Sequence, residues 1–220
     1  SCSLVGSEMC IRDSIGAMPL EKCELRHWLT CFDQLAKRNP VSAGFLLQVC
    51  KQALKYCRKR RYAITNVLDD MVVGDVGKKA EISERILTNK ELGELLRALD
   101  EKIYPPYYSA LIRLLIVFGC RTTELRRSEV QEWDFKEMLW TVPKEHSKTK
   151  VAIFRPIPEA ILPFVTKLVE QNRHTGLLLG ELKGQSSVSE YGRTAHRRIN
   201  QAPWTLHDIR HTFTTMLNLS

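Results

Sequence analysis

The stretch Thr205-Leu206-His207-Asp208-Ile209-Arg210-His211 decides how the rest of the sequence is interpreted. Thr205 followed three residues later by Asp208 is typical of a helix start, so we expect a helix to begin here. His207 and Arg210 lie three residues apart in its first turn and therefore face the same way. Because the N-terminal end of a helix attracts anions, the stretch predicts a phosphate site. The H-x-x-R spacing alone also occurs in many unrelated helices.

A second charged group lies upstream, at the end of the most apolar part of the chain. Residues 107–118 are apolar almost all round, which predicts a central buried helix that Gly119 ends. Arg121 and Glu124 follow directly. A guanidinium so close to an apolar core needs a partner. The sequence leaves two partners open for Arg121, a structural ion pair with Glu124 or a bound anion.

Between these two segments the sequence predicts a small sheet. Residues 130–135, 139–142 and 151–157 are expected to form three short strands joined by turns. The turn after the second strand is polar and contains Lys148. A lysine at a hairpin tip normally only faces solvent. Here it completes an ordered set along the chain, in which an Arg, a Glu and a hairpin Lys precede the H-x-x-R segment.

The ordered set of Arg121, Lys148, His207 and Arg210 resembles the catalytic domain of the tyrosine recombinases, specifically the phage and genomic-island integrases. The strand Trp140-Thr141-Val142-Pro143 is similar to the hairpin of that group. The resemblance covers about residue 88 to the end of the chain. It implies a mainly α fold with a small antiparallel β-sheet (α+β). In this fold a helical core-binding module is followed by a tyrosine-recombinase-type catalytic domain, here expected to lack its C-terminal helices.

The resemblance implies a role for each of the four residues. Arg121 and Arg210 would hold the two non-bridging oxygens of a scissile phosphate and stabilise the charge of the transition state. His207 would hydrogen-bond the same phosphate and assist proton transfer. Lys148 would protonate the leaving 5′-oxygen of the DNA. The reaction would be site-specific DNA recombination or integration through a covalent 3′-phosphotyrosyl link, which needs neither a metal nor another cofactor.

Neighbouring residues receive supporting roles from the same resemblance. Glu124 would orient Arg121 without touching the phosphate itself. His211 is expected to pack or support rather than react. Lys150 and Lys144 lie close enough to Lys148 in the sequence to compete with it as the general acid.

The nucleophile that the family uses is a tyrosine downstream of the H-x-x-R segment. We expect it beyond Ser220, in a longer protein from which this chain would be a fragment. The chain itself is then expected to bind DNA weakly without cleaving it. Six tyrosines precede the H-x-x-R segment, none is expected to be the nucleophile, and three of them (Tyr107, Tyr108 and Tyr191) are expected to pack.

The domain organisation follows from composition and helical periodicity. Residues 1–14 contain a stretch that resembles a translated sequencing-adapter tract, so they are expected to be non-native. Residues 15–72 are expected to form a partial helical core-binding, DNA-binding domain, 73–87 a linker, and 88–220 a C-terminally truncated catalytic domain. Helices are predicted over residues 21–37, 42–60, 88–103, 107–118, 159–172 and 188–200. Asn39 and Pro40 end the first, Ser42 caps the second, and Thr88 with Glu91 forms a capping box at the start of the third.

The predicted helix over residues 42–60 carries a basic face. Lys51, Lys55, Arg58 and Lys59 share this face, and the helix itself has no acidic residue between them. We therefore predict contact with DNA phosphates; the alternative is a solvated surface face. Residues 1–80 hold 13 basic and 8 acidic residues (+5) out of the chain's net charge of +8, which favours a polyanionic partner. The implied partners are double-stranded DNA with its attachment sites, and further copies of the protein assembled on that DNA.

Cysteine spacing and hydropathy bear on location. The seven cysteines include no C-x-x-C pair, which argues against a zinc ribbon or a disulfide framework. A reducing cytoplasm fits this pattern. The resemblance implies a bacterial or phage-encoded protein associated with the nucleoid. No apolar run is long enough to cross a bilayer, so no membrane partner is expected.

Three other functions remain open on the residues alone. His207 and His211 have the H-x-x-x-H spacing of zinc proteases, but Asp208 stands where those enzymes carry a Glu. A non-catalytic DNA-binding protein would use only the basic helix and the phosphate pocket. A type IB topoisomerase would relax DNA with similar residues, and the two-domain order favours integration over it.

Overall fold

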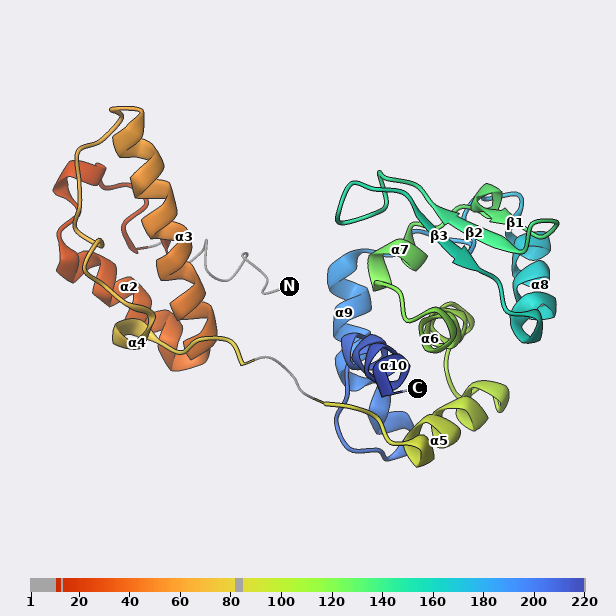
Figure 1. The fold of residues 1–220 in the computed structure, drawn as a ribbon. Coiled ribbons are helices and arrows are strands. Elements are labelled where there is room, and N and C mark those ends of the chain that lie inside the picture. Colours follow the sequence, from red (N-terminus) through yellow and green to blue (C-terminus); the bar gives the residue numbers. More distant parts are fainter. Residues whose placement is uncertain (1–10, 13, 82–84, 220) are drawn as a thin grey trace. The chain divides into compact units, whose positions relative to one another are not determined.

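The computed structural model describes residues 11–12, 14–81 and 85–219 of the chain. The chain divides into two compact units, residues 1–82 (unit 1) and residues 83–220 (unit 2) (Figure 1). Of the segment predicted to be non-native, residues 1–10 and 13 lie outside the described residues. Among the described helices, none combines the length and the apolar character that a membrane crossing needs.

Unit 1 is built on two helices, α2 (Leu25–Arg38) and α3 (Pro40–Lys59). The predicted break at Asn39 and Pro40 is confirmed, but the cap differs from the prediction. Asn39, not Ser42, caps α3, because its side-chain oxygen accepts a hydrogen bond from the backbone N–H of Ser42 at 3.0 Å. Pro40 fits the first helical position, where no backbone N–H is needed. A short 3₁₀ turn, η1 (Leu20–Lys22), precedes α2.

The segment predicted as a linker begins with structure that belongs to unit 1. Its first residues form α4 (Val73–Val76), and Val76 is buried in the unit 1 core. Lys78 N donates a hydrogen bond to the backbone oxygen of Pro40 at 3.0 Å. Ile11, from the segment expected to be non-native, also packs against this core. Each of these residues is held by contacts distant in sequence, which composition does not reveal. The core of unit 1 comprises mainly Trp28, Phe32, Leu35, Leu46, Leu47, Cys50, Leu54 and Leu68.

Unit 2 begins slightly before the predicted boundary at Thr88. Leu87 is fully buried, and its N–H donates to Thr212 Oγ1 at 2.9 Å. The predicted capping box is confirmed. Glu91 N donates to Thr88 Oγ1 at 3.2 Å, and Thr88 N donates to Glu91 Oε2 at 2.9 Å, which starts α5 (Asn89–Asp100).

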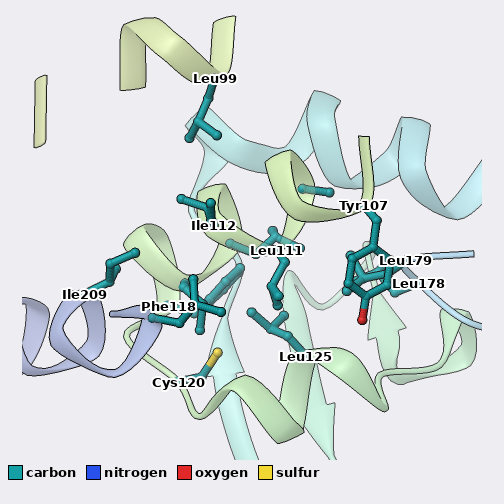
Figure 2. Packing of buried hydrophobic residues seen from close by; sticks show 14 of the residues in the cluster. Leu99, Tyr107, Leu111, Ile112, Phe118, Cys120, Leu125, Leu178, Leu179 and Ile209 are labelled. Atoms are coloured by element: carbon teal, nitrogen blue, oxygen red, sulfur yellow. The ribbon is translucent and has the colours of Figure 1, made fainter. Parts of the chain in front are cut away.

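The core of unit 2 surrounds α6 (Pro106–Phe118), as its apolar sequence predicts. In Figure 1, α6 lies between α5 on one side and the sheet and α7 (Thr122–Arg126) on the other. Figure 2 shows α6 side chains packed together with residues from other segments of the chain. These include Leu99 from α5, Leu125 from α7 and Ile209 from α10 (Leu206–Leu219). The helix therefore fixes α7 and α10, the two elements that carry the predicted phosphate ligands.

The sheet is antiparallel with strand order β1-β2-β3. Its strands are β1 (Trp133–Asp134), β2 (Leu139–Val142) and β3 (Ile153–Pro156). The first strand is shorter than predicted, because residues 130–132 form a 3₁₀ turn, η2 (Val130–Glu132), that directs Glu132 into the interior. Trp133 pairs with Trp140, and the two indole rings stack at 4.7 Å between centroids.

The rest of unit 2 is helical, so the predicted fold class, mainly α with a small antiparallel sheet, is confirmed. The predicted helix over residues 188–200 begins earlier, at Gln185, and changes from an α-helix to a 3₁₀ helix after Thr194. The 3₁₀ helix ends at Asn200, which has a left-handed backbone conformation. The remaining elements are η3 (Glu159–Ile161), α8 (Leu162–Asn172), α9 (Gln185–Thr194) and η4 (Ala195–Ile199).

Candidate active site

The start of α10 has the predicted geometry. Thr205 N donates to Asp208 Oδ2 at 2.8 Å, and Asp208 N donates to Thr205 Oγ1 at 3.4 Å. Ile209 is buried against α6, whereas His207 is exposed and Arg210 is half-buried. The capped first turn thus fixes the direction in which Arg210 leaves the helix.

Arg210 reaches from α10 to the end of α6. Its Nη1 donates a hydrogen bond to the backbone oxygen of Gly119, 2.5 Å away, at the point where the left-handed φ of 53° ends α6. Burial lowers the pKa of Arg210, and the like charge of Arg121 lowers it further. Two guanidinium groups therefore lie within electrostatic reach of each other, and an anion bound between them would relieve their repulsion.

Arg121 forms the ion pair that the sequence left open. Its Nη1 lies 3.1 Å from Glu124 Oε1, and its backbone N–H donates to Glu124 Oε2 at 3.2 Å. Glu124 is only 1% exposed, whereas the Arg121 side chain is 35% exposed. A guanidinium has five N–H donors, so the ion pair leaves donors of Arg121 accessible from solvent. The two partners that the sequence offered therefore do not exclude each other.

Arg155 is the residue that the sequence analysis missed. It lies on β3 opposite Trp140, and its Nη2 donates to Glu124 Oε2 at 2.7 Å. Its guanidinium also lies over the Trp140 ring, 5.0 Å from the centroid. Directly opposed residues on antiparallel strands share a face of the sheet. Because Trp140 is fully buried, a correct strand register would have placed Arg155 on the buried face.

Lys148 lies in the loop between β2 and β3 and is exposed, as are Lys144 and Lys150. The loop is tied to the body of unit 2 by His146, whose Nδ1 lies 2.7 Å from Oε1 of the buried Glu132. The tie is two residues from Lys148, so it limits how far that side chain can move. The three lysines share one loop, and the fold does not single out one of them.

The structure thus brings together some of the predicted residues and leaves others apart. Arg121, Glu124 and Arg210 converge where α6, α7 and α10 meet. Within the described part of the chain, the exposed side chains of His207 and Lys148 form no hydrogen bond with them. His211 is half-buried, and its buried Nδ1 has no hydrogen-bond partner among the described residues.

Two other groups near the site are unsuited to nucleophilic chemistry. Burial raises the pKa of the Cys120 thiol to about 12, so it stays protonated near neutral pH. The tyrosines of unit 2 are packed. Tyr104 and Tyr107 are buried, which raises the pKa of each to about 12, and Tyr108 stacks on Tyr191 with ring centroids 3.5 Å apart.

Two of the four cations on the basic helix of unit 1, α3, have partners within the protein. Lys51 Nζ donates to the backbone oxygens of Asp69 and Met71, at 2.8 and 2.6 Å. Arg58 pairs with Asp69 at 2.6 Å, and that hydrogen bond lowers the pKa of the Asp69 carboxyl. The acidic partner missing from the helix itself is supplied by the segment that returns after it. Of the four predicted DNA-binding residues, Lys55 and Lys59 remain exposed.

A zinc site at His207 and His211 gains no support. Within the described residues there is no group of three or more His, Cys, Asp and Glu side chains arranged to hold a metal ion. The Arg210 guanidinium lies between the two histidines in sequence, and its positive charge would oppose a cation there.

Comparison with known proteins gives a consistent answer. Residues 85–220 match the sequence model of the Phage integrase family. A Tn1549 transposon integrase solved in complex with a circular intermediate DNA is 17% identical, with a TM-score of 0.71 over 97% of this chain and 80% of that chain. A lambda integrase dimer bound to a core site is 17% identical, with a TM-score of 0.73 over 97% and 80%.

A lambda integrase tetramer bound to a Holliday junction is 18% identical, with a TM-score of 0.70 over 97% of this chain and 65% of that chain. At these identities the structural matches show the fold. A search of curated protein sequences finds no match to the chain.

Proposed function

The chain belongs to the phage integrase family, and from that premise we propose that it is the part of a tyrosine recombinase that binds duplex DNA and holds the scissile phosphate. One observation carries the proposal. Arg121 and Arg210 come from segments far apart in the sequence, yet Arg210 Nη1 donates to the backbone oxygen of Gly119, two residues before Arg121, and Arg121 pairs with a single buried carboxylate. Two guanidiniums with one carboxylate leave positive charge for a bound anion.

The chemistry proposed for this site is phosphoryl transfer. Arg121 and Arg210 each donate hydrogen bonds to a non-bridging oxygen, and they hold it more strongly as negative charge grows in the transition state. A tyrosine oxygen attacks phosphorus, the bond from phosphorus to the 5′-oxygen breaks, and a 3′-phosphotyrosyl link forms. The leaving 5′-oxygen takes its proton from Lys148, and His207 hydrogen-bonds the phosphate and takes up the proton that the attacking tyrosine hydroxyl releases. The phosphotyrosyl bond keeps the energy of the broken bond, so the scheme uses no cofactor.

The attacking tyrosine is proposed to come from outside this chain, downstream of the H-x-x-R segment in a longer protein. Packing supports this, because the four tyrosines of unit 2 are buried or stacked. The 220-residue chain is therefore expected to form no covalent adduct with nicked or intact duplex DNA. Denaturing gel electrophoresis with end-labelled DNA measures this directly. An adduct formed by the chain alone would show that one of its own tyrosines attacks.

The DNA-binding part of the proposal predicts a specific loss in two variants. R121A and R210A should each weaken duplex binding about fivefold, because each removes a phosphate contact. The slope of log K against log salt should also fall by about one, since one fewer counterion is released. Fluorescence anisotropy across a salt series measures both quantities.

The control is R173A. Arg173 is exposed at the end of α8 and carries the same charge outside the candidate site, so this variant should change the affinity less than twofold. If R121A and R210A bind as tightly as the parent chain, the phosphate site proposed here is refuted.

The assembly proposed for the whole protein follows its structural relatives. Lambda integrase has been solved as a dimer on a core site and as a tetramer on a Holliday junction. We extend this to the present chain as self-assembly of the longer protein on its attachment sites. A cytoplasmic location is proposed on the cysteines, because Cys23, Cys50, Cys57 and Cys120 are free thiols.

A further inference from the structure

Arg155 is an unusual residue for the inner face of a small sheet. Its side chain is only 15% exposed, and it lies between the Trp140 ring and Glu124. Burying a charge is unfavourable unless an opposite charge meets it, and Glu124 supplies that charge. Nothing in the roles assigned above to Arg121, Arg210, His207 or Lys148 uses Arg155.

The charges around Glu124 do not balance. One carboxylate, 1% exposed, meets the Nη1 of Arg121 at 3.1 Å and the Nη2 of Arg155 at 2.7 Å. Arg210 adds a third guanidinium, which donates to the backbone oxygen of Gly119. Three positive charges and one negative charge leave the cluster at +2. A phosphodiester carries one negative charge, and the pentavalent phosphorus of the transition state carries about two.

The position of each atom separates the roles of the three arginines. Arg155 Nη1 is buried and has no hydrogen-bond partner among the described residues, and its Nη2 is occupied by Glu124. Arg121, at 35% exposed, is the more accessible of the two guanidiniums that Glu124 holds. A phosphate arriving from solvent would therefore meet Arg121 and not Arg155.

We infer that Arg155 is a positioning residue of the phosphate site: by holding Oε2 of Glu124, it keeps that carboxylate from fully neutralising Arg121. The inference rests on the proposed function. Because Glu124 is shared between two guanidiniums, it orients Arg121 through a single side-chain contact and leaves the other donors of Arg121 for the phosphate. The charge of Arg155 also keeps the net charge of the cluster, three arginines and one glutamate, at +2.

Removal of Arg155 should therefore act through Glu124. In R155M the methionine keeps much of the side-chain volume, but Glu124 Oε2 loses its shortest partner. Oε2 then keeps only the backbone N–H of Arg121, so the carboxylate can turn and engage the Arg121 guanidinium through both oxygens, which draws that guanidinium away from the phosphate. The net charge of the cluster falls to +1 at the same time.

A double-mutant cycle on the 220-residue chain tests this inference with duplex DNA as the probe. R155M should weaken binding about tenfold in the parent chain but no more than about twofold in an E124Q background, where no carboxylate remains to be held. In the E124Q background R155M should leave the salt slope unchanged, because Arg121 then keeps its phosphate contact, whereas R121A lowers the slope by about one. A purely structural role of Arg155 would give the same loss in both backgrounds.

The chain offers a closely matched control in Arg113. This arginine also pairs with a carboxylate, Asp100, and also lies over an aromatic ring, Phe164, at 5.3 Å. R113M removes the same charge and the same kinds of contact elsewhere on unit 2, so it should change affinity less than twofold. Urea unfolding of each variant identifies any that are not folded under the binding conditions.

Two results would overturn the inference while the phosphate site stands. One is an equal loss for R155M with and without Glu124. The other is a fall of about one in the salt slope of R155M in the E124Q background, which would make Arg155 a direct phosphate contact. If R121A and R210A leave binding unchanged, the proposed function fails, and this inference fails with it.

Discussion

Replacement of Gly119 by alanine is expected to lower the free energy of unfolding of unit 2 by about 3 kcal/mol. Gly119 has a φ of 53°, a left-handed conformation that disfavours any side chain by about 1–2 kcal/mol. A Cβ at this position would also lie 1.9 Å from Cδ1 of Phe213, so α10 would have to move away from α6. Urea unfolding followed by the fluorescence of the buried tryptophans of unit 2 measures the loss.

The same substitution should also reduce DNA binding, because Arg210 depends on this contact. Its Nη1 donates to the backbone oxygen of Gly119, and both Arg210 and Phe213 lie on α10. Displacement of α10 would separate Arg210 from Arg121. We expect G119A to bind duplex DNA at least as weakly as R210A under conditions where the variant is still folded.

Gly176 provides the matched control for this prediction. It has a φ of 76°, also left-handed, but a Cβ there would meet nothing within 4 Å. G176A should therefore show only the backbone strain, about 1 kcal/mol, and bind DNA normally. If G119A and G176A are equally destabilised, the close approach of Phe213 is not what makes glycine necessary at the end of α6.

The parts of the fold that the sequence predicted well are set by local rules. The capping box at Thr88, the end of α6 at Gly119 and the helix start at Thr205 each depend on hydrogen bonds or backbone angles within four residues. The apolar run of α6 likewise predicts its central position, because a helix that is apolar all round must be enclosed. Arg121 and Arg210 each follow such a local signal, but only the resemblance to the tyrosine recombinases indicated that the two hold one phosphate.

The contacts that the sequence did not reveal depend on how distant segments meet. Arg155 reaches Glu124 only because β3 pairs with β2 in a register that places it opposite Trp140. Arg58 meets Asp69 only because the chain turns back along α3 after that helix ends. Hydrophobic periodicity does not fix strand register or the course of a returning loop. From the sequence, Arg155 was therefore an ordinary strand residue and Arg58 an unpaired cation on a helix.

Glu132 is the second position where a large effect is expected. Its carboxylate is buried and lies within hydrogen-bond distance of three groups: Ser128 Oγ at 2.9 Å, Trp140 Nε1 at 3.0 Å and His146 Nδ1 at 2.7 Å. An ionised carboxylate only accepts hydrogen bonds, so it can satisfy all of these groups at once. The network joins the turn after α7 and strand β2 to the loop that carries Lys148.

The variant E132Q is expected to lower the free energy of unfolding of unit 2 by about 3 kcal/mol. Glutamine has nearly the same shape, but it replaces one accepting oxygen with an NH₂ group that must face a donor. At least one buried donor then loses its partner. E137Q is the control, because Glu137 is exposed in the turn between β1 and β2, and it should change stability by less than 0.5 kcal/mol.

The same variant should loosen the loop that carries Lys148, the proposed general acid. In the parent chain His146 ties this loop to Glu132, which restrains the exposed lysines at positions 148 and 150. Without the tie, trypsin should cleave after these lysines several times faster in E132Q, and also in H146A, which removes the tie while leaving the Glu132 contacts to Ser128 and Trp140. Mass spectrometry of timed digests measures the rates. Equal cleavage in E132Q, H146A and E137Q would mean that the loop is held by other contacts, and that Glu132 stabilises only the sheet.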